Sequence, residues 1–205
     1  SDVCSSDLQP VTITITGTND APVIVAQTGD ATSASITEQV GTTGQPISGA
    51  TDSVSGKISF TDVDLTDQHT VAVVGALSPT TGTSPIAQSI VWQSGGVNPN
   101  VINLSSAQLA ALHSVLDSAL SVSIVKDSTG SGTGQISWKF SAADSNFDFL
   151  AQGETLVVTY NVQVKDSQGS IATQPVTITI TGTNDAPVIV AQTGDRSEEH
   201  TSELQ

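Results

Sequence analysis

The most regular pattern in the chain is an alternation of apolar and hydroxyl side chains. Val11 to Thr16 reads VTITIT, and the same letters return at Val176 to Thr181. Strict alternation puts the apolar side chains on one face of an extended strand, so each run predicts a half-buried β-strand. The stretch 155–164, TLVVTYNVQV, alternates in the same way. With the turn sequence DSQG at 166–169 after it, this stretch and 171–181 predict a β-hairpin.

Shorter apolar runs, separated by turns rich in Gly and Ser, predict further strands. We expect these strands at 23–26, 57–61, 70–74, 89–92, 121–125 and 135–140.

One segment, Ser105 to Leu120, departs from the β pattern. It places leucines on one helical stripe and carries Ser105 and Gln108 at the spacing of a capping box, with the stripe made of Leu109, Leu112, Leu116 and Leu120. It predicts a short amphipathic helix that closes one end of the core, with a partner-binding helix as the alternative. The whole pattern therefore predicts an all-β fold, an antiparallel β-sandwich with a short inserted α-helix.

Composition limits the functions that the chain can perform. Aromatic residues are only 3% of the chain, so its core must be built mainly from Val, Ile, Leu and Ala. Twenty acidic residues stand against five basic ones, for a formal net charge of −15. Nucleic acid is a disfavoured partner because phosphate binding needs a basic surface, whereas cations are favoured. No stretch is long and apolar enough to span a membrane.

Both ends of the chain are expected to be non-native. Residues 1–8 read SDVCSSDL and back-translate as TCAGACGTGTGCTCTTCCGATCT. Residues 196–205 read RSEEHTSELQ, and their start back-translates as the reverse complement of that DNA. Both resemble a sequencing adapter read on its two strands, so neither tail enters the fold argument. Cys4, the only cysteine, lies in the first tail, and 15 acidic residues against four lysines remain between the tails.

The native part contains a long internal repeat. Residues 9–30 and 174–195 are identical, which gives a period of 165 residues. We therefore expect a tandem array, with neighbouring repeats as partners in the same chain. Residues 9–18 are then the last strand of a preceding repeat, 19–183 one whole repeat, and 184–195 the start of the next. The absence of Met fits an internal part of a longer protein.

Acidic residues gather next to the predicted strand ends. Asp62 and Asp64 follow one strand, with Asp67 a turn away, and Asp166 ends another. The linker before Pro22 carries Asn19 and Asp20, so these groups are expected to meet at one pole of the sandwich. Two carboxylates about 5 Å apart repel by roughly 3 kcal/mol at an effective dielectric constant near 20. Ca²⁺ would remove that repulsion with six to eight oxygen ligands, whereas zinc prefers His and Cys. The alternative is that each Asp is a solvated turn residue.

Three strings in order, GTNDAPVI, FTDVDLTDQHTVAV and DFLAQGETLVVTYNVQVKDSQG, resemble the VCBS repeat of large secreted bacterial adhesins of the RTX type. That repeat is similar to cadherin domains. The resemblance implies a cadherin/Ig-like sandwich, export by type I secretion to the bacterial cell surface, and Ca²⁺ at the junctions between repeats. For the junction with the preceding repeat it implies Asn19, Asp20, Asp62, Asp64 and Asp166. For the junction with the next repeat it implies Glu38, Asp148, Asn184 and Asp185, with Glu154 as a further candidate.

The chain departs from cadherin linkers at two places in each copy. Gly17 and Gly182 stand where those linkers carry an acid, and Ala21 and Ala186 stand where they carry a second Asn. We therefore expect one or two ions at a junction rather than three.

Catalysis is not expected from this sequence. His69 lies two residues after Asp67 but opens a strand, where a surface or cross-strand role is expected, and His113 lies on the polar side of the helix. Nucleophile elbows, HExxH pairs and phosphate loops are missing from the sequence. Trp92 and Trp138 are expected to pack in or beside the core. The expected function is a calcium-stabilised extender module of an adhesin involved in cell adhesion or biofilm, with polysaccharide bound by other domains. The alternatives are a carbohydrate-binding module using 75–135, or an ion-independent spacer.

Overall fold

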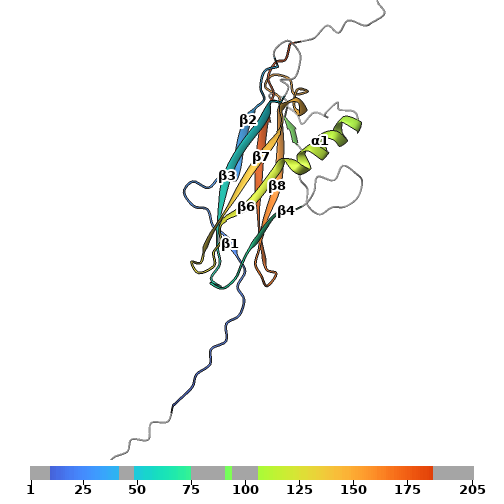
Figure 1. Cartoon of the computed structure of the whole chain (residues 1–205). Helices are drawn as coiled ribbons and strands as arrows, with labels where there is room; N and C mark the ends of the chain where they lie inside the picture. The colour runs from blue at the N-terminus through green and yellow to red at the C-terminus, as the bar shows by residue number, and fades with distance from the viewer. Residues whose placement is uncertain (1–9, 42–48, 75–90, 94–105, 187–205) are drawn as a thin grey trace, which may run out of the picture.

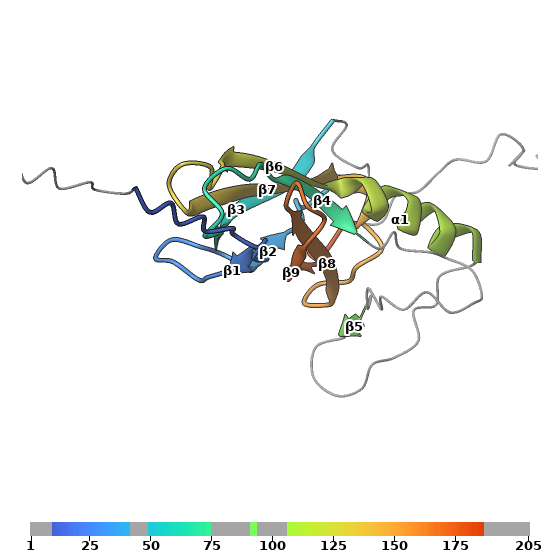
Figure 2. The same ribbon diagram turned by 90° about the horizontal axis from the view of Figure 1, so that it is seen from below.

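The computed structural model describes residues 10–41, 49–74, 91–93 and 106–186. Within these residues the chain forms two β-sheets that pack face to face, with one helix beside them (Figures 1 and 2). The first sheet has the strand order β1-β3-β7-β6, which are Val23–Ile24, Thr51–Thr61, Thr133–Ala143 and Leu120–Lys126. The second sheet has the order β2-β9-β8-β4, which are Ser33–Thr37, Ile171–Thr181, Thr155–Lys165 and Thr70–Val74. A short strand β5, Val91–Gln93, also pairs with β8. The predicted all-β sandwich is thereby confirmed.

The strands β8 and β9 form the predicted hairpin along their whole length, from the pair Thr155↔Thr181 to the pair Lys165↔Ile171. Gly169 has φ 103°, a left-handed conformation that glycine adopts without steric cost in the turn. The alternating apolar residues of both strands point into the core and are buried; they are Leu156, Val158, Tyr160, Val162, Val164, Val176, Ile178 and Ile180.

The facing sheet supplies the larger side chains of the core. Ile58 and Phe60 of β3 and Ile136, Trp138 and Phe140 of β7 are almost completely buried. Each fully buried side chain of this size contributes about 1.5–3 kcal/mol through the hydrophobic effect. The core is therefore aliphatic on the β8–β9 side apart from Tyr160, and more aromatic on the β3–β7 side, and the prediction that Trp138 lies in it is confirmed. The side chain of Trp92 lies outside the described residues.

The helix α1, Ser106–Ala119, covers one side of the sandwich. Leu112 and Leu116 are buried in the main core, and the backbone oxygen of Leu116 accepts a hydrogen bond of 2.9 Å from the Tyr160 hydroxyl. The prediction of a helix that closes the core is thereby confirmed. Ser105 of the predicted capping box and the side chain of Leu109 lie outside the described residues. The last predicted helical residue, Leu120, instead begins β6.

The sequence pattern was wrong about β2 and incomplete about several strand lengths. β2 has the sequence SASIT, whose alternation rests on only two apolar residues, Ala34 and Ile36, and was not predicted. It pairs parallel to β9, which makes the sandwich antiparallel except at this edge. β3 and β7 have 11 residues each and are longer than the predicted 57–61 and 135–140. The prediction was too short because the additional residues include Ser, Gly and Thr, which give no apolar pattern. No helix among the described residues is long and apolar enough to cross a membrane.

Candidate metal centres at the two poles

The long strands β3, β7, β8 and β9 run between two ends of the sandwich. We name these two ends the N pole, where the chain enters at Asn19, and the C pole, where it leaves at Asp185 (Figure 1). A strand of 11 residues spans about 36 Å, so groups at the two poles are far apart. Acidic side chains gather at both poles.

At the N pole, four aspartates form what we call the N-pole cluster: Asp62, Asp64, Asp67 and Asp166. Asp62 and Asp67 belong to the loop between β3 and β4, and Asp166 opens the turn between β8 and β9. Carboxylate oxygens of Asp62, Asp67 and Asp166 lie within 4.8 Å of one another, and all three residues are buried. The Asp62 carboxylate also accepts a hydrogen bond of 2.9 Å from the Asp64 backbone N–H. Strands that are distant in sequence thus bring these acids together.

The linker contacts the same cluster. The Asn19 side-chain amide donates to Asp166 Oδ2 at 3.0 Å and to the Ser170 hydroxyl at 3.0 Å. The backbone N–H of Asp20 donates to Asp64 Oδ2 at 2.6 Å. The predicted meeting of Asn19, Asp20, Asp62, Asp64 and Asp166 at one pole is therefore confirmed. Asp67 belongs to this cluster but was not among the predicted ligands, although the DxDxxD spacing of residues 62, 64 and 67 was the available signal.

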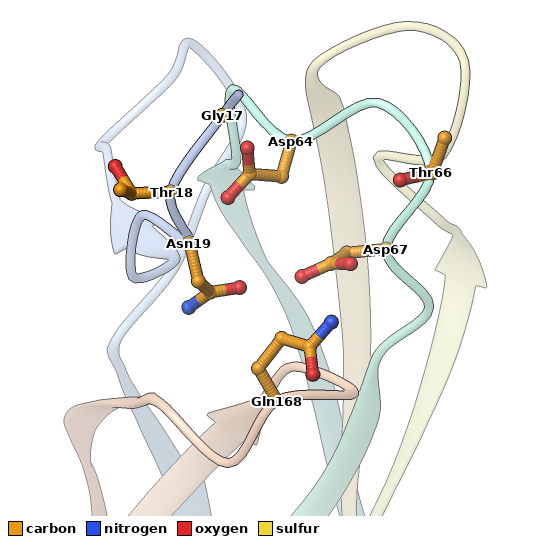
Figure 3. Close-up of a pocket in the computed structure, with 7 residues that line it drawn as sticks. All are labelled: Gly17, Thr18, Asn19, Asp64, Thr66, Asp67 and Gln168. Atoms are coloured by element: carbon orange, nitrogen blue, oxygen red, sulfur yellow. The ribbon is translucent and has the colours of Figure 1, made fainter.

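An open pocket of about 250 Å³ lies beside this cluster; Gly17, Thr18, Asn19, Asp64, Thr66, Asp67 and Gln168 line it (Figure 3). Figure 3 shows the carboxylates of Asp64 and Asp67 and the amide of Asn19 pointing into the space between the linker and the β3–β4 loop. Asp67 Oδ1 accepts a hydrogen bond from the Ser167 hydroxyl at 3.1 Å, but its Oδ2 is buried without a partner. Among the described residues that line the pocket, Asp67 therefore offers a buried carboxylate oxygen that no hydrogen bond satisfies.

Asp166 is held ionised by its surroundings. Burial alone would raise the pKa of its carboxyl, but donors from Asn19 and from the backbone of Ser170, Gly169 and Gln168 outweigh burial and lower that pKa. A carboxylate kept charged in this way is a ready ligand for a cation.

His69 is the one buried imidazole beside the N-pole cluster in the part of the chain that the structure describes. Its Nε2 lies 3.0 Å from Asp62 Oδ2 and its Nδ1 lies 2.7 Å from Asp127 Oδ1. Burial lowers the pKa of His69, but its hydrogen bonds to the carboxylates of Asp62 and Asp127 outweigh burial and raise that pKa overall. The prediction of a surface or cross-strand role was wrong, because His69 is buried between two acids from different loops.

The C pole holds a second group, the C-pole cluster: Glu38, Asp52, Asp144, Asp148 and Asp185. Carboxylate oxygens of Glu38, Asp148 and Asp185 lie within 4.8 Å of one another. Asp144 is fully buried, and its Oδ1 accepts a hydrogen bond of 2.8 Å from the Gln39 backbone N–H. The predicted set of Glu38, Asp148 and Asp185 is thus brought together by the fold.

Crowding of acids shifts the pKa values at the C pole upwards. Burial, and then the charge of Asp144, raise the pKa of Asp52 to about 6. Burial, and then the charges of Asp185 and Asp144, raise the pKa of Asp148. Burial also raises the pKa of Glu38, and this effect outweighs its hydrogen bonds from Thr183. The C-pole carboxylates therefore repel one another, as expected for closely spaced acids that share a partly buried site.

Within the part of the chain that the structure describes, four carboxylate oxygens at the C pole are buried without a hydrogen-bond partner: Glu38 Oε2, Asp52 Oδ2, Asp144 Oδ2 and Asp185 Oδ2. A buried charged oxygen without a partner costs several kcal/mol, so a cation would relieve this arrangement. The ligand atoms are all oxygens, which fits Ca²⁺ better than a metal that prefers nitrogen or sulfur. The residues at both poles thus fit a calcium ion.

Asp52 lies at the start of β3 and Asp144 directly after β7, and neither has another acid within three positions in the sequence, so both look like ordinary solvent-exposed acids and were missed. The further candidate Glu154 accepts a hydrogen bond from the Ala151 backbone N–H at 2.9 Å and lies outside the three-carboxylate group, so its implied role is not supported by position. Asn184 is exposed at this pole.

Gly182 explains one departure from cadherin linkers. A Cβ atom at this position would lie 2.5 Å from the Leu150 Cβ and 2.6 Å from the Ala151 backbone oxygen. No side chain fits there without moving the backbone, so an acidic residue cannot occupy the position. The same glycine in the first copy, Gly17, has no atom within 4 Å of a built Cβ.

Comparisons with known proteins return no matching protein family and no matching curated protein. Among solved structures, the chain is similar to a pilin subunit, CooA, of enterotoxigenic Escherichia coli, with a TM-score of 0.38 and 10% identity over 82% of this chain and 100% of that one. It is also similar to PapD-like domain 7 of human CEP192, with a TM-score of 0.36 and 9% identity over 89% of this chain and 98% of that one. A third similar structure is AggA, the major subunit of aggregative adherence fimbriae type I of Escherichia coli, with a TM-score of 0.32 and 15% identity over 82% of this chain and 99% of that one. Likeness at this level carries no argument about function.

Proposed function

We propose that this chain is a calcium-stabilised structural repeat that acts as a non-enzymatic extender in a bacterial cell-surface adhesin. The observation that carries the proposal is the position of the two identical linkers. The first copy, with Asn19 and Asp20, lies at the N-pole cluster, and the second, with Asn184 and Asp185, lies at the C-pole cluster. A repeat built in this way presents half of a junction at each end.

Joining two repeats would unite the two halves. The linker that leaves one repeat beside Glu38 and Asp148 would enter the next beside the counterparts of Asp62, Asp64 and Asp166. Every ligand in such a junction would be a carboxylate, amide or backbone oxygen, the ligand type that Ca²⁺ prefers. When bound, the ion would supply the positive charge that the acid-rich junction lacks. The protein's own residues would set the distance and orientation of consecutive repeats.

The strength of this effect follows from mass action. Extracellular calcium modules typically bind with dissociation constants on the order of 10⁻⁴ to 10⁻³ M. A hundredfold excess of free ion over the dissociation constant adds about 2.7 kcal/mol to the free energy of unfolding. For a domain of this size, that corresponds to a rise in melting temperature of about 5–10 °C.

The proposal includes an extracellular location, on the cell surface of a bacterium after type I secretion. It is supported by the VCBS-like motifs in the sequence. Adhesion itself would be performed by other domains of the parent protein. The repeat would hold those domains away from the cell.

The test is a pair of melting curves, one in excess EDTA and one in millimolar CaCl₂. We expect calcium to raise the melting temperature, and we expect the double variant Asp62→Asn/Asp64→Asn to lose most of that rise. Asp117→Asn, which removes one charge from the exposed side of α1, serves as the control and should keep the calcium effect. Identical melting in EDTA and calcium would refute calcium stabilisation and leave an ion-independent spacer.

A further inference from the structure

The second copy of the linker binds the repeat that it leaves. Thr183 donates two hydrogen bonds to Glu38 Oε1, from its backbone N–H at 2.8 Å and from its hydroxyl at 2.9 Å. Asp185 Oδ1 accepts a hydrogen bond of 2.7 Å from the Gly41 backbone N–H. These contacts use the Thr side chain, the Thr backbone and the Asp carboxylate.

The first copy of the linker binds the repeat that it enters, and it does so through other atoms. The Asn19 amide donates to Asp166 and to Ser170, and the Asp20 backbone N–H donates to Asp64. Among the described hydrogen bonds the Thr18 side chain makes none, and Figure 3 shows it on the other side of the linker from Asp64 and Asp67.

The two sets of contacts are compatible on one linker. A shift of 165 residues aligns Thr18 with Thr183, and likewise Asn19 with Asn184 and Asp20 with Asp185. The preceding repeat then uses the Thr N–H, the Thr hydroxyl and the Asp carboxylate. The following repeat uses the Asn side-chain amide and the Asp N–H, so no atom is needed twice. Both copies also lie outside helices and strands, as a shared linker must.

We infer that each linker in the array binds both of its neighbours at once and so forms a two-sided clasp between consecutive repeats. The clasp consists of the Thr-Asn-Asp linker, Glu38 and Gly41 of the repeat before it, and Asp64, Asp166 and Ser170 of the repeat after it. The partner of each pole is therefore another copy of this repeat. The inference rests on the tandem array of the proposed function but needs no calcium, because every contact is a hydrogen bond made by the protein itself.

The chain as it stands provides matched controls, because each linker copy here contacts only one repeat. In excess EDTA, Asn19→Ala and Thr183→Val should each lower the melting temperature by about 2–4 °C, the effect of losing about one charge-assisted hydrogen bond. Asn184→Ala and Thr18→Val change the same residue types in the other copy, where the described residues offer them no such contact, and should shift it by less than about 1 °C. Equal shifts in melting temperature for Asn19→Ala and Asn184→Ala, or for Thr183→Val and Thr18→Val, would overturn the assignment of the Asn contacts to the following repeat and of the Thr contacts to the preceding one.

The two-sided clasp itself is tested in a longer chain, made by continuing residue 183 directly into residue 19 of a second copy. ¹⁵N relaxation in excess EDTA should show the two repeats tumbling as one elongated particle. Thr183→Val combined with Asn19→Ala of the second copy, both at the internal linker, should let them tumble separately, and Thr18→Val/Asn19→Ala of the first copy, at the first linker, should not. Independent tumbling of the unchanged chain in EDTA would overturn the inference. A failed calcium titration would not, so the clasp and the calcium proposal can fail separately.

Discussion

The two copies of one 22-residue segment have different environments where the structure describes both, at 10–21 and 175–186. In the first copy, Val11, Ile13 and Ile15 are 85%, 80% and 89% exposed, and the segment extends away from the sandwich (Figure 1). In the second copy, Val176, Ile178 and Ile180 are 0% exposed and belong to β9. The letters are the same, so local propensity cannot explain the difference. Pairing with β2 and β8 is what turns this sequence into a strand.

The largest difference between the two copies is expected when the same side chain is shortened in each of them. Ile178→Ala should destabilise the fold by about 3 kcal/mol, because it leaves a cavity in the core beside β8. Ile13→Ala should change the free energy of unfolding by less than about 0.5 kcal/mol, because its side chain is already in water. Urea unfolding of the two variants measures both values.

A large loss for Ile13→Ala would mean that the first copy packs against something in solution, such as β2 and β8 of another molecule. Within one chain, the first copy cannot take the place of β9 between β2 and β8 in the same strand direction. Residues 17–22 would have to return from the C pole to β1 at the N pole, and six residues span at most about 20 Å against the roughly 36 Å of the strand. Such a result would therefore point to exchange between molecules.

A smaller difference is expected at the paired glycines. Gly182→Ala should cost about 1–3 kcal/mol, because the added methyl group meets Leu150 and the backbone of Ala151. Gly17→Ala meets nothing in this chain and should be close to neutral. Thermal melting of both variants checks the prediction, and equal melting temperatures would show that the packing at the C pole is looser than described.

Much of this architecture could be predicted from the sequence, and the failures have identifiable physical causes. The β8–β9 hairpin was predictable because one face of each strand is buried, and a long, strict alternation of apolar residues follows from that. β2 was not predictable, because this half-buried edge strand, SASIT, is too short and too polar to give a clear apolar pattern. The N-pole cluster was predictable because its acids directly follow strand ends. Asp52 and Asp144 were not, because their burial depends on contacts between segments far apart in sequence.

The poles should also differ in their response to pH when calcium is removed. The pKa of Asp52 is about 6 in the folded protein, against an ordinary value of 3.8, and the pKa values of Glu38 and Asp148 are raised too. A raised folded pKa contributes stability that is full below the unfolded value and lost as the pH rises through the folded value. In EDTA, the fold should therefore become more stable as the pH falls from 7 through 6 towards 4.

Asp166 at the N pole acts in the opposite sense. Its lowered pKa contributes stability above its unfolded value that is lost only as the pH falls below about 4. Urea unfolding at pH 7 and pH 5 in chelator measures the balance, and Asp52→Asn should flatten the slope between these two values. This is the smallest of the expected effects, and a fold that weakens steadily from pH 7 to pH 5 would contradict the assignment of raised pKa values at the C pole.

Binding of Ca²⁺ at both poles can be observed in a calcium titration followed by ¹H–¹⁵N spectra of the whole chain. We expect amide signals to shift at 62–67 and 166–170 at the N pole and at 38–41 and 144–149 at the C pole, while those in the middle of β7 and β8 hardly move. Spectra that do not change between EDTA and several millimolar calcium would contradict calcium binding at the poles.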